Sequence, residues 1–120
     1  KRSMMEINLD ALLKTICART YPDEAPEGTA TPYVTWQGIG GQSKRALDGD
    51  HCDTRNTLMQ ISVWSDRRLE ALTLIRQIED ALVASPSFQV ARPESEPMSV
   101  KEYDPDLFGC IQRFTIWSTR

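Results

Sequence analysis

His51, Cys52 and Asp53 are adjacent, and these residue types could form a thiol nucleophile with a histidine base, or a metal site. Adjacent residues of an extended chain point to opposite faces, so His51 and Cys52 cannot easily pair with each other. A closed zinc site needs several ligands at recognisable spacing, and the chain has one histidine. We interpret the cluster as loop residues and keep a small cysteine-dependent enzyme as the least favoured alternative.

Other chemical motifs are incomplete. Asp48-Gly49-Asp50 resembles the start of a calcium-binding loop, but the closing glutamate of that pattern is missing. The glycine-rich segment 38–41 lacks the ending of a phosphate-binding loop. We therefore expect no catalytic, cofactor-binding or metal-binding residue, and no enzyme. One acidic stretch could supply paired carboxylates for general acid–base catalysis, but we interpret its side chains as solvated surface charges. Its residues are Glu94, Glu96, Glu102, Asp104 and Asp106.

Composition limits the possible partners. The chain has 14 basic and 17 acidic residues, a formal charge of −3 and no basic stripe, which argues against specific nucleic-acid binding. No apolar run approaches the roughly 18–20 residues that span a bilayer, so we expect no membrane partner. The three cysteines have no C-x-x-C spacing and are typical of a reduced, cytoplasmic protein.

The length of 120 residues predicts a single domain over 1–120. Met4 or Met5 is a candidate natural start, which would make residues 1–3 an addition. Apolar residues at i, i+4, i+7, i+8 and i+11 predict a helix over residues 5–16. A second apolar stripe predicts a helix that Ser65 or Asp66 caps and that ends before Pro86. Three apolar residues beside this stripe are either extra core or a contact surface: Leu69, Leu72 and Val83.

Segments rich in β-branched and aromatic residues predict four strands, at 33–39, 58–64, 88–92 and 110–118. The expected fold is α+β, with two helices packed on one face of a small, mainly antiparallel four-stranded sheet. The order of elements is α-β-β-α-β-β. Terminal strands of such a sheet could extend it across subunits by edge pairing.

Two long polar segments remain, Gly41–Asp53 and Pro93–Asp106. Loops on a rigid scaffold commonly carry function, so we place partner contacts in both segments. Within the first segment, the predicted docking residues are charged: Lys44, Arg45, Asp48 and Asp50.

Three stretches carry a resemblance to a known family: Tyr21-Pro22-Asp23 with Pro26, Gly28 and Pro32-Tyr33-Val34; Gln60-Ile61-Ser62-Val63-Trp64-Ser65 with Glu70-Ala71; and Glu102-Tyr103-Asp104-Pro105 with Gly109 and Phe114-Thr115-Ile116-Trp117. In this order and at these separations, they resemble the tail-completion family of long-tailed bacteriophages and prophages. That family is related in fold to the tail-terminator proteins of lambda-like phages. The resemblance runs from the first helix to the last strand and leaves out the segment Gly41–Asp53.

The resemblance implies a structural role. Such proteins form a ring, typically a hexamer, on the last ring of the tail tube, stop its polymerisation and present a surface to which the filled head binds. The implied partners are further copies of the chain, the tail-tube protein and the head-completion protein. Assembly is expected in the host bacterial cytoplasm, with a final place in the virion tail. A head-side connector ring is the alternative within the same class.

If DNA passes through such a ring, the net charge of the subunits matters. Six copies at −3 each would carry a formal charge of −18. Like charges repel, so this balance would discourage DNA from sticking in the lumen.

Overall fold

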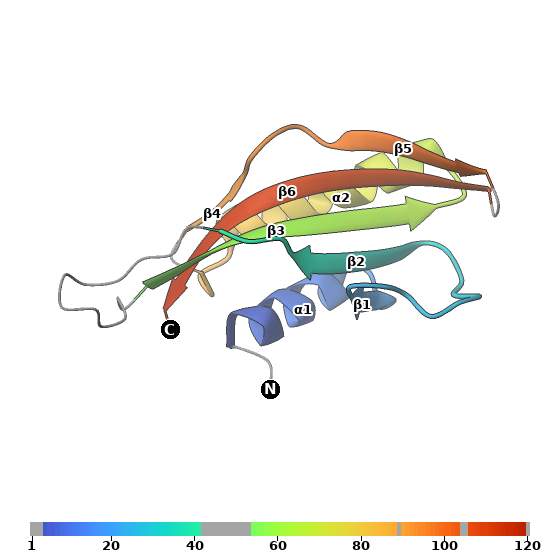
Figure 1. Cartoon of the computed structure of the whole chain (residues 1–120). Helices are drawn as coiled ribbons and strands as arrows, with labels where there is room; N and C mark the ends of the chain where they lie inside the picture. Colours follow the sequence, from blue (N-terminus) through green and yellow to red (C-terminus); the bar gives the residue numbers. More distant parts are fainter. Residues whose placement is uncertain (1–3, 42–53, 89, 104–105, 120) are drawn as a thin grey trace.

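The computed structural model describes residues 4–41, 54–88, 90–103 and 106–119. Both predicted helices form, because each sequence stripe gives a helix with one apolar side. In chain order the elements are α1 (Met4–Ile16), β1 (Thr20–Pro22), β2 (Tyr33–Gly38), β3 (Thr54–Ser65), α2 (Arg68–Ala84), β4 (Val90–Pro93), β5 (Met98–Tyr103) and β6 (Asp106–Thr119) (Figure 1).

The described strands form one six-stranded mixed sheet, in the order β1-β2-β3-β6-β4, with β5 also paired to β6. The β1–β2 pair is parallel and the other pairs are antiparallel. β4 pairs with Phe114–Trp117 of β6, and β5 pairs with Asp106–Ile111, so these two short strands share one edge. The predicted four-stranded sheet is therefore wrong, although the fold is α+β with two helices.

The two strands that the sequence did not predict lie at the edges of the sheet. β1 has three residues and ends in Pro22, a residue type that usually marks a loop. β5 lies in the segment interpreted as a polar excursion, and its side chains do not alternate between buried and exposed. Edge strands bury little surface, so they carry little of the period-two pattern by which strands are recognised.

β3 and β6 are longer than predicted and form the centre of the sheet. They pair from Thr54 with Thr119 to Ser65 with Phe108, whereas the sequence predicts strands only at 58–64 and 110–118. β6 lies between β3 and the edge that β4 and β5 form, so its backbone is already paired on both sides. The last strand of the chain is therefore not a terminal strand of the sheet. The edges available to a partner are β1 and β4–β5.

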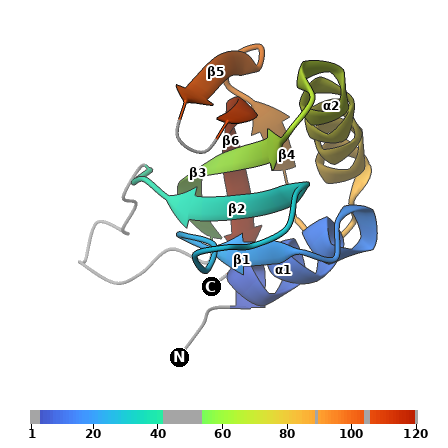
Figure 2. The same ribbon diagram turned by 90° about the vertical axis from the view of Figure 1, so that its right-hand side faces the viewer.

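Both helices lie on one face of the sheet, and no described helix covers the other face, which we call the outer face (Figure 1; Figure 2). The register places Met59 opposite Phe114 and Val34 opposite Val63, so alternate residues of neighbouring strands point toward the helices. These side chains and the apolar sides of the helices form one buried core. Its fully buried members include Leu9, Leu13, Val34, Met59, Ile61, Val63, Ile75, Ile78, Leu82, Phe114 and Ile116.

Asp10 of α1 is buried although it carries a charge. Its Oδ1 accepts a hydrogen bond from Nε1 of Trp36 at 2.9 Å, and its Oδ2 lies 2.9 Å from Nζ of Lys14. A carboxylate is tolerated inside a protein where a cation and a hydrogen-bond donor compensate its lost hydration. Asp10 thus ties α1 to β2 through the Trp36 side chain.

We expect Asp10→Ala to lower the free energy of unfolding by about 1–3 kcal/mol, because it removes a hydrogen bond to a charged acceptor inside the protein. Urea denaturation followed by tryptophan fluorescence measures the effect. The control is Lys14→Met, which removes the half-exposed partner and should cost at most about 1 kcal/mol. An Asp10→Ala loss no larger than that of the control would contradict the prediction.

Candidate assembly surfaces

The four predicted docking residues, Lys44, Arg45, Asp48 and Asp50, lie outside the described residues. The same holds for His51, Cys52 and Asp53. The docking role of the first four stays a prediction. The structure places the rest of the surface around the sheet, including residues 93–103 and 106 of the second segment assigned to partner contacts.

Cys17 and Cys110 are buried free thiols on the core side of the fold. Burial raises the pKa of the Cys110 thiol, and a hydrogen bond with Ser99 acts in the opposite direction. A protonated thiol inside the core is a poor nucleophile. Within the part of the chain that the structure describes, no three His, Cys, Asp or Glu side chains gather as a metal site. No helix in this part has the length and hydrophobicity to cross a membrane.

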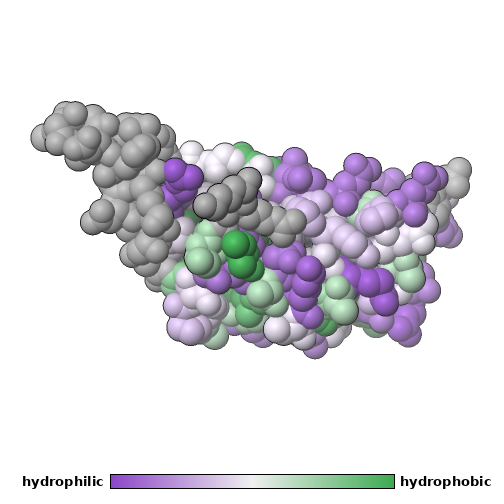
Figure 3. All heavy atoms as spheres, turned by 90° about the horizontal axis from the view of Figure 1, so that it is seen from below, coloured by the Kyte–Doolittle hydropathy of each residue, from purple (hydrophilic) through white to green (hydrophobic). Residues whose placement is uncertain are grey.

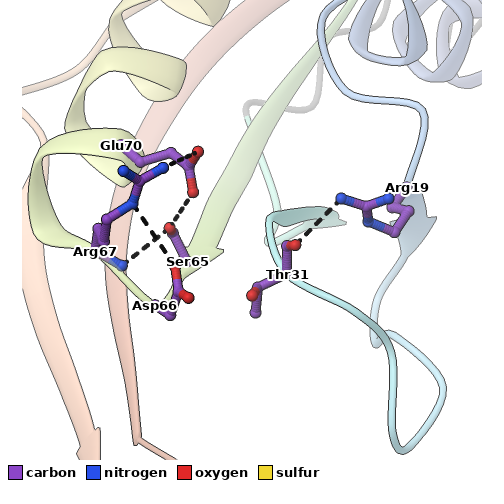
Figure 4. Close-up of polar contacts among 6 residues, drawn as sticks. All are labelled: Arg19, Thr31, Ser65, Asp66, Arg67 and Glu70. Carbon is purple, nitrogen blue, oxygen red and sulfur yellow. Dashed lines mark hydrogen bonds and ion pairs between the residues drawn. The ribbon is translucent and has the colours of Figure 1, made fainter.

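The start of α2 is held by a polar cluster at the end of β3 (Figure 4). The buried Ser65 hydroxyl donates to Oε1 of Glu70 and accepts a hydrogen bond from the Arg67 backbone N–H at 3.1 Å. Nη2 of Arg67 donates to Oε2 of Glu70, also at 3.1 Å. The predicted cap by Ser65 or Asp66 is wrong in detail. The N-cap is Arg67, which makes no side-chain cap bond, and Ser65 holds the first turn from two residues earlier.

The hydrogen bond from Ser65 holds the pKa of Glu70 below its usual 4.5, and the nearby Arg67 acts in the same direction. A lowered pKa in the fold means that the carboxylate stabilises the fold above pH 4.5. This contribution is lost as the pH falls through the lowered pKa.

We expect Ser65→Ala to raise the pKa of Glu70 toward 4.5 in a carboxyl NMR titration, because it removes the largest cause of the shift. It should also weaken the fall in stability on acidification. The matched variant Arg67→Gln should raise the pKa less. A pKa of Glu70 that does not move in Ser65→Ala would refute the assignment.

Phe108 of β6 lies beside the start of α2 and between two cations. The Arg68 guanidinium carbon is 5.2 Å from the centre of the ring, and Nζ of Lys101 is 4.6 Å from it. Nζ of Lys101 also lies 2.7 Å from Oδ1 of Asp106, which fixes the β5–β6 hairpin. A hollow of 690 Å³ surrounds this helix start, and Leu69 on its wall is 75% exposed. Exposed apolar groups mixed with arginine are typical of protein contact surfaces.

A second hollow of 340 Å³ lies over the outer face, beneath the segment Asp23–Ala25. Thr35, Gln60 and Ser62 contribute uncharged polar groups to its lining, and Tyr33 lies at its edge. Burial raises the pKa of Tyr33, and the charge of Glu102 adds to this effect. Asp23 and Glu24 add carboxylates to this lining, and Trp64 and Ile111 add apolar surface.

Exposed apolar side chains gather toward the two ends of the sheet. Leu69 and Tyr103 lie at the end where β3 leads into α2, and Tyr103 is 80% exposed. Met4, Ile7 and Val83 lie at the opposite end, where α1 begins and α2 finishes (Figure 1). Seen from below, on the side of α1, green hydrophobic atoms lie among purple hydrophilic ones (Figure 3). These residues are candidates for contact surfaces at the two ends.

Sequence patterns found part of this surface. Of the three residues predicted as extra core or contact surface, Leu72 packs against the core, while Leu69 and Val83 are exposed. Tyr103 lies in the segment Pro93–Asp106, which we assigned to partner contacts as a polar segment without singling out this residue. An aromatic residue within a run of charges is the signal that could have identified it.

The comparison with protein families covers almost the whole of this architecture. The model of the tail completion protein gp17 family matches residues 7–119. The chain belongs to this family. The match includes all the core elements and also residues 42–53, which lie outside the described residues. Membership of the family gives the chain a structural role in the phage tail. No curated protein sequence is similar enough to count as a match.

A solved structure shares the fold of this family member. It is a chain in the virion of a native gene transfer agent particle, with a TM-score of 0.58 and 18% sequence identity. The alignment covers 97% of this chain and 90% of that chain. At this identity the likeness concerns the fold, and it shows that the arrangement described here also occurs in a particle component.

Proposed function

We propose that the chain caps the end of the tail tube, stops its polymerisation and provides the surface to which the head joins. Membership of the tail-completion family, over residues 7–119, is the observation that carries the proposal. The proposed partners are the tail-tube protein on one side and the head-completion protein on the other. The protein assembles with them in the host bacterial cytoplasm and remains in the virion tail as a component without enzymatic activity.

The shape of the molecule supports a role between two partners. One end of the sheet carries Leu69 and Tyr103 near the start of α2, and the other carries Val83 where α2 finishes. These ends differ in their elements and in their side chains, so they suit two different proteins. A subunit that only lengthened the tube would need its two ends to complement each other, because each new layer would bind the previous one.

We further propose that copies of the chain form a closed ring, with six copies as the resemblance implies. Heterologous contacts between copies give a ring when the rotation closes. DNA passes through the lumen without specific binding, which fits the formal charge of −3 per chain. The likeness to a chain in a virion particle supports assembly with other particle proteins.

Deleting the gene from the source phage or prophage and examining the particles by electron microscopy tests the proposed role. Abnormally long tails without heads, shortened again when the chain is supplied from a plasmid, are the expected result. Tails of normal length beside unjoined heads would replace the proposal with a head-side connector. Intact particles would overturn both roles.

The docking role of Lys44, Arg45, Asp48 and Asp50 is tested in the same cells. Reversing these four charges should reduce head attachment about tenfold or more, since opposed charges at an interface become like charges. The control reverses Arg76 and Asp80, which are exposed on α2. If the variant with the four reversed charges joins heads as well as the control does, the docking role of these residues is wrong.

A further inference from the structure

A ring built from head-to-tail contacts needs two different surfaces on opposite sides of each subunit. The order of the sheet defines these two sides. α1 and β1 lie on one side, and the edge formed by β4 and β5 lies on the other (Figure 2). This inference rests on the proposed ring, and it concerns which residues of one copy meet which residues of the next.

The α1 side presents an exposed surface with few charges. Its exposed helix positions are Met4, Ile7, Ala11, Lys14 and Thr15, of which only Lys14 is charged. Met4 is 68% exposed and Ile7 is 48% exposed. Surface helices normally expose charged and polar residues opposite their apolar side, whereas the exposed side of α1 also carries Met4, Ile7 and Ala11.

The β4–β5 side combines apolar and acidic residues. Met98 of β5 is 59% exposed and Val90 of β4 is 36% exposed. Between the two strands the edge is interrupted, and this interruption carries the exposed Glu94 and Glu96. A bulge with charges normally protects a sheet edge from further strand pairing, so a partner here binds through side chains rather than by adding a strand.

The interruption is held in a fixed position. The backbone N–H of Glu94 donates to the carbonyl of Arg113 at 2.8 Å. Nε2 of the buried Gln112 donates to the carbonyl of Ser95 at 2.8 Å and to Oε1 of Glu79 at 2.7 Å. The two glutamates are therefore attached to an ordered backbone. Binding at this surface would lose little backbone entropy.

The two sides lie at matching levels along the strands. Thr20, the first residue of β1, closely follows α1. It pairs with Val34, which pairs with Val63, which in turn pairs with Cys110, so Thr20 and Cys110 lie at the same level along the strands. The helix has 13 residues and runs along the strands for about 20 Å, the length of about six strand residues (Figure 1). From the level of Cys110 it therefore reaches the level of Phe114–Trp117, the stretch of β6 that pairs with β4.

The two sides also differ in charge. Lys14 and Arg19 are exposed on the α1 side, where Nζ of Lys14 lies 2.9 Å from Oδ2 of Asp10 and the Arg19 side chain bonds the carbonyl groups of Thr31 and Pro32. The opposite edge presents two glutamates, Glu94 and Glu96, and one exposed arginine, Arg92. We propose that the exposed face of α1 in one copy packs against the β4–β5 edge of a second copy, with apolar contacts beside opposite charges.

Charge exchange in the deletion cells tests the contact. Ile7→Glu with Ala11→Glu places acidic groups on α1 opposite the acidic edge, and Glu94→Lys with Glu96→Lys reverses that edge. Each pair alone should lower the yield of joined particles about tenfold or more, because like charges meet or the opposite charge is lost. All four changes together should restore most of the yield. The matched control places the same spacing of glutamates on exposed α2, as Thr73→Glu with Gln77→Glu.

The outcomes separate this contact from the proposed function. If the wild-type chain does not shorten the tails of deletion cells, the capping role fails. If the wild-type chain does shorten the tails, two results would overturn the contact. One is a wild-type yield of joined particles from the α1 variant, and the other is a fourfold variant whose yield is no higher than that of either pair. Circular dichroism melting of each purified variant confirms that a low yield comes from assembly and not from unfolding.

Cross-linking gives a second readout. Cysteines at Ala11 and Glu96, in a Cys52→Ser background, react with a bismaleimide in purified particles. We expect a ladder of multiples of the 13.6 kDa chain. The buried Cys17 and Cys110 should not react. A ladder should require both new cysteines. Dimers from Ala11→Cys alone would mean that two α1 faces meet, which contradicts a head-to-tail contact, as would the absence of any chain-to-chain product.

Discussion

Phe114→Ala is expected to lower the free energy of unfolding by about 3–5 kcal/mol. Phe114 is fully buried, faces the helices from the central strand β6, and pairs with Met59 on one side and Pro93 on the other. Removing its ring loses apolar burial and leaves a cavity that the surrounding sheet cannot close, because β6 is paired on both sides. Urea denaturation with a linear extrapolation measures the change.

The control for this loss is Val83→Ala on α2, where the side chain is 56% exposed. It should change stability by no more than about 0.5 kcal/mol. Phe114→Leu should fall between the two, because it keeps part of the apolar volume. A Phe114→Ala loss below about 1.5 kcal/mol would show that this part of the core is not closely packed.

Gly109→Val is expected to destabilise the protein by about 2–3 kcal/mol, because the outer face has no room for a side chain at this position. Gly109 lies opposite Trp64 in the sheet. A Cβ at Gly109 would lie 2.7 Å from Cζ3 and 2.8 Å from Cε3 of the Trp64 ring. The indole therefore covers the glycine, and a valine must push the ring away from the sheet.

A double-mutant cycle with Trp64→Ala separates this clash from a general intolerance of side chains at residue 109. In the Trp64→Ala background, Gly109→Val should be neutral or stabilising, because valine favours strands and glycine does not. The coupling should therefore be at least about 2 kcal/mol, near the upper end of the range for residues in contact. Equal destabilisation in both backgrounds would contradict the role of Trp64.

Sequence patterns predicted the buried elements well, because burial leaves a period in the sequence. The helix stripes through Leu9 and Leu13 and through Ile75 and Ile78 are all core residues. Edge strands leave no such period. β5 has no fully buried residue, and β1 is three residues long, so the sheet was predicted with four strands instead of six.

The candidate surfaces were predicted only in part. The sequence placed Leu69 and Val83 beside a helix stripe and left open whether they are core or contact surface, and only the fold shows that both are exposed. That α1 and the β4–β5 edge lie on opposite sides of the subunit follows from the order of strands across the sheet, and sequence periodicity does not reveal this order. The proposed docking charges Lys44, Arg45, Asp48 and Asp50 stay a prediction.

The central place of β6 also has a consequence during translation. β6 is the last described strand to leave the ribosome, yet it pairs with β3, β4 and β5, so most of the sheet cannot form before it is made. Such long-range pairing raises the contact order and slows folding. A nascent chain in which β6 has not yet been made therefore has no finished sheet to offer a partner.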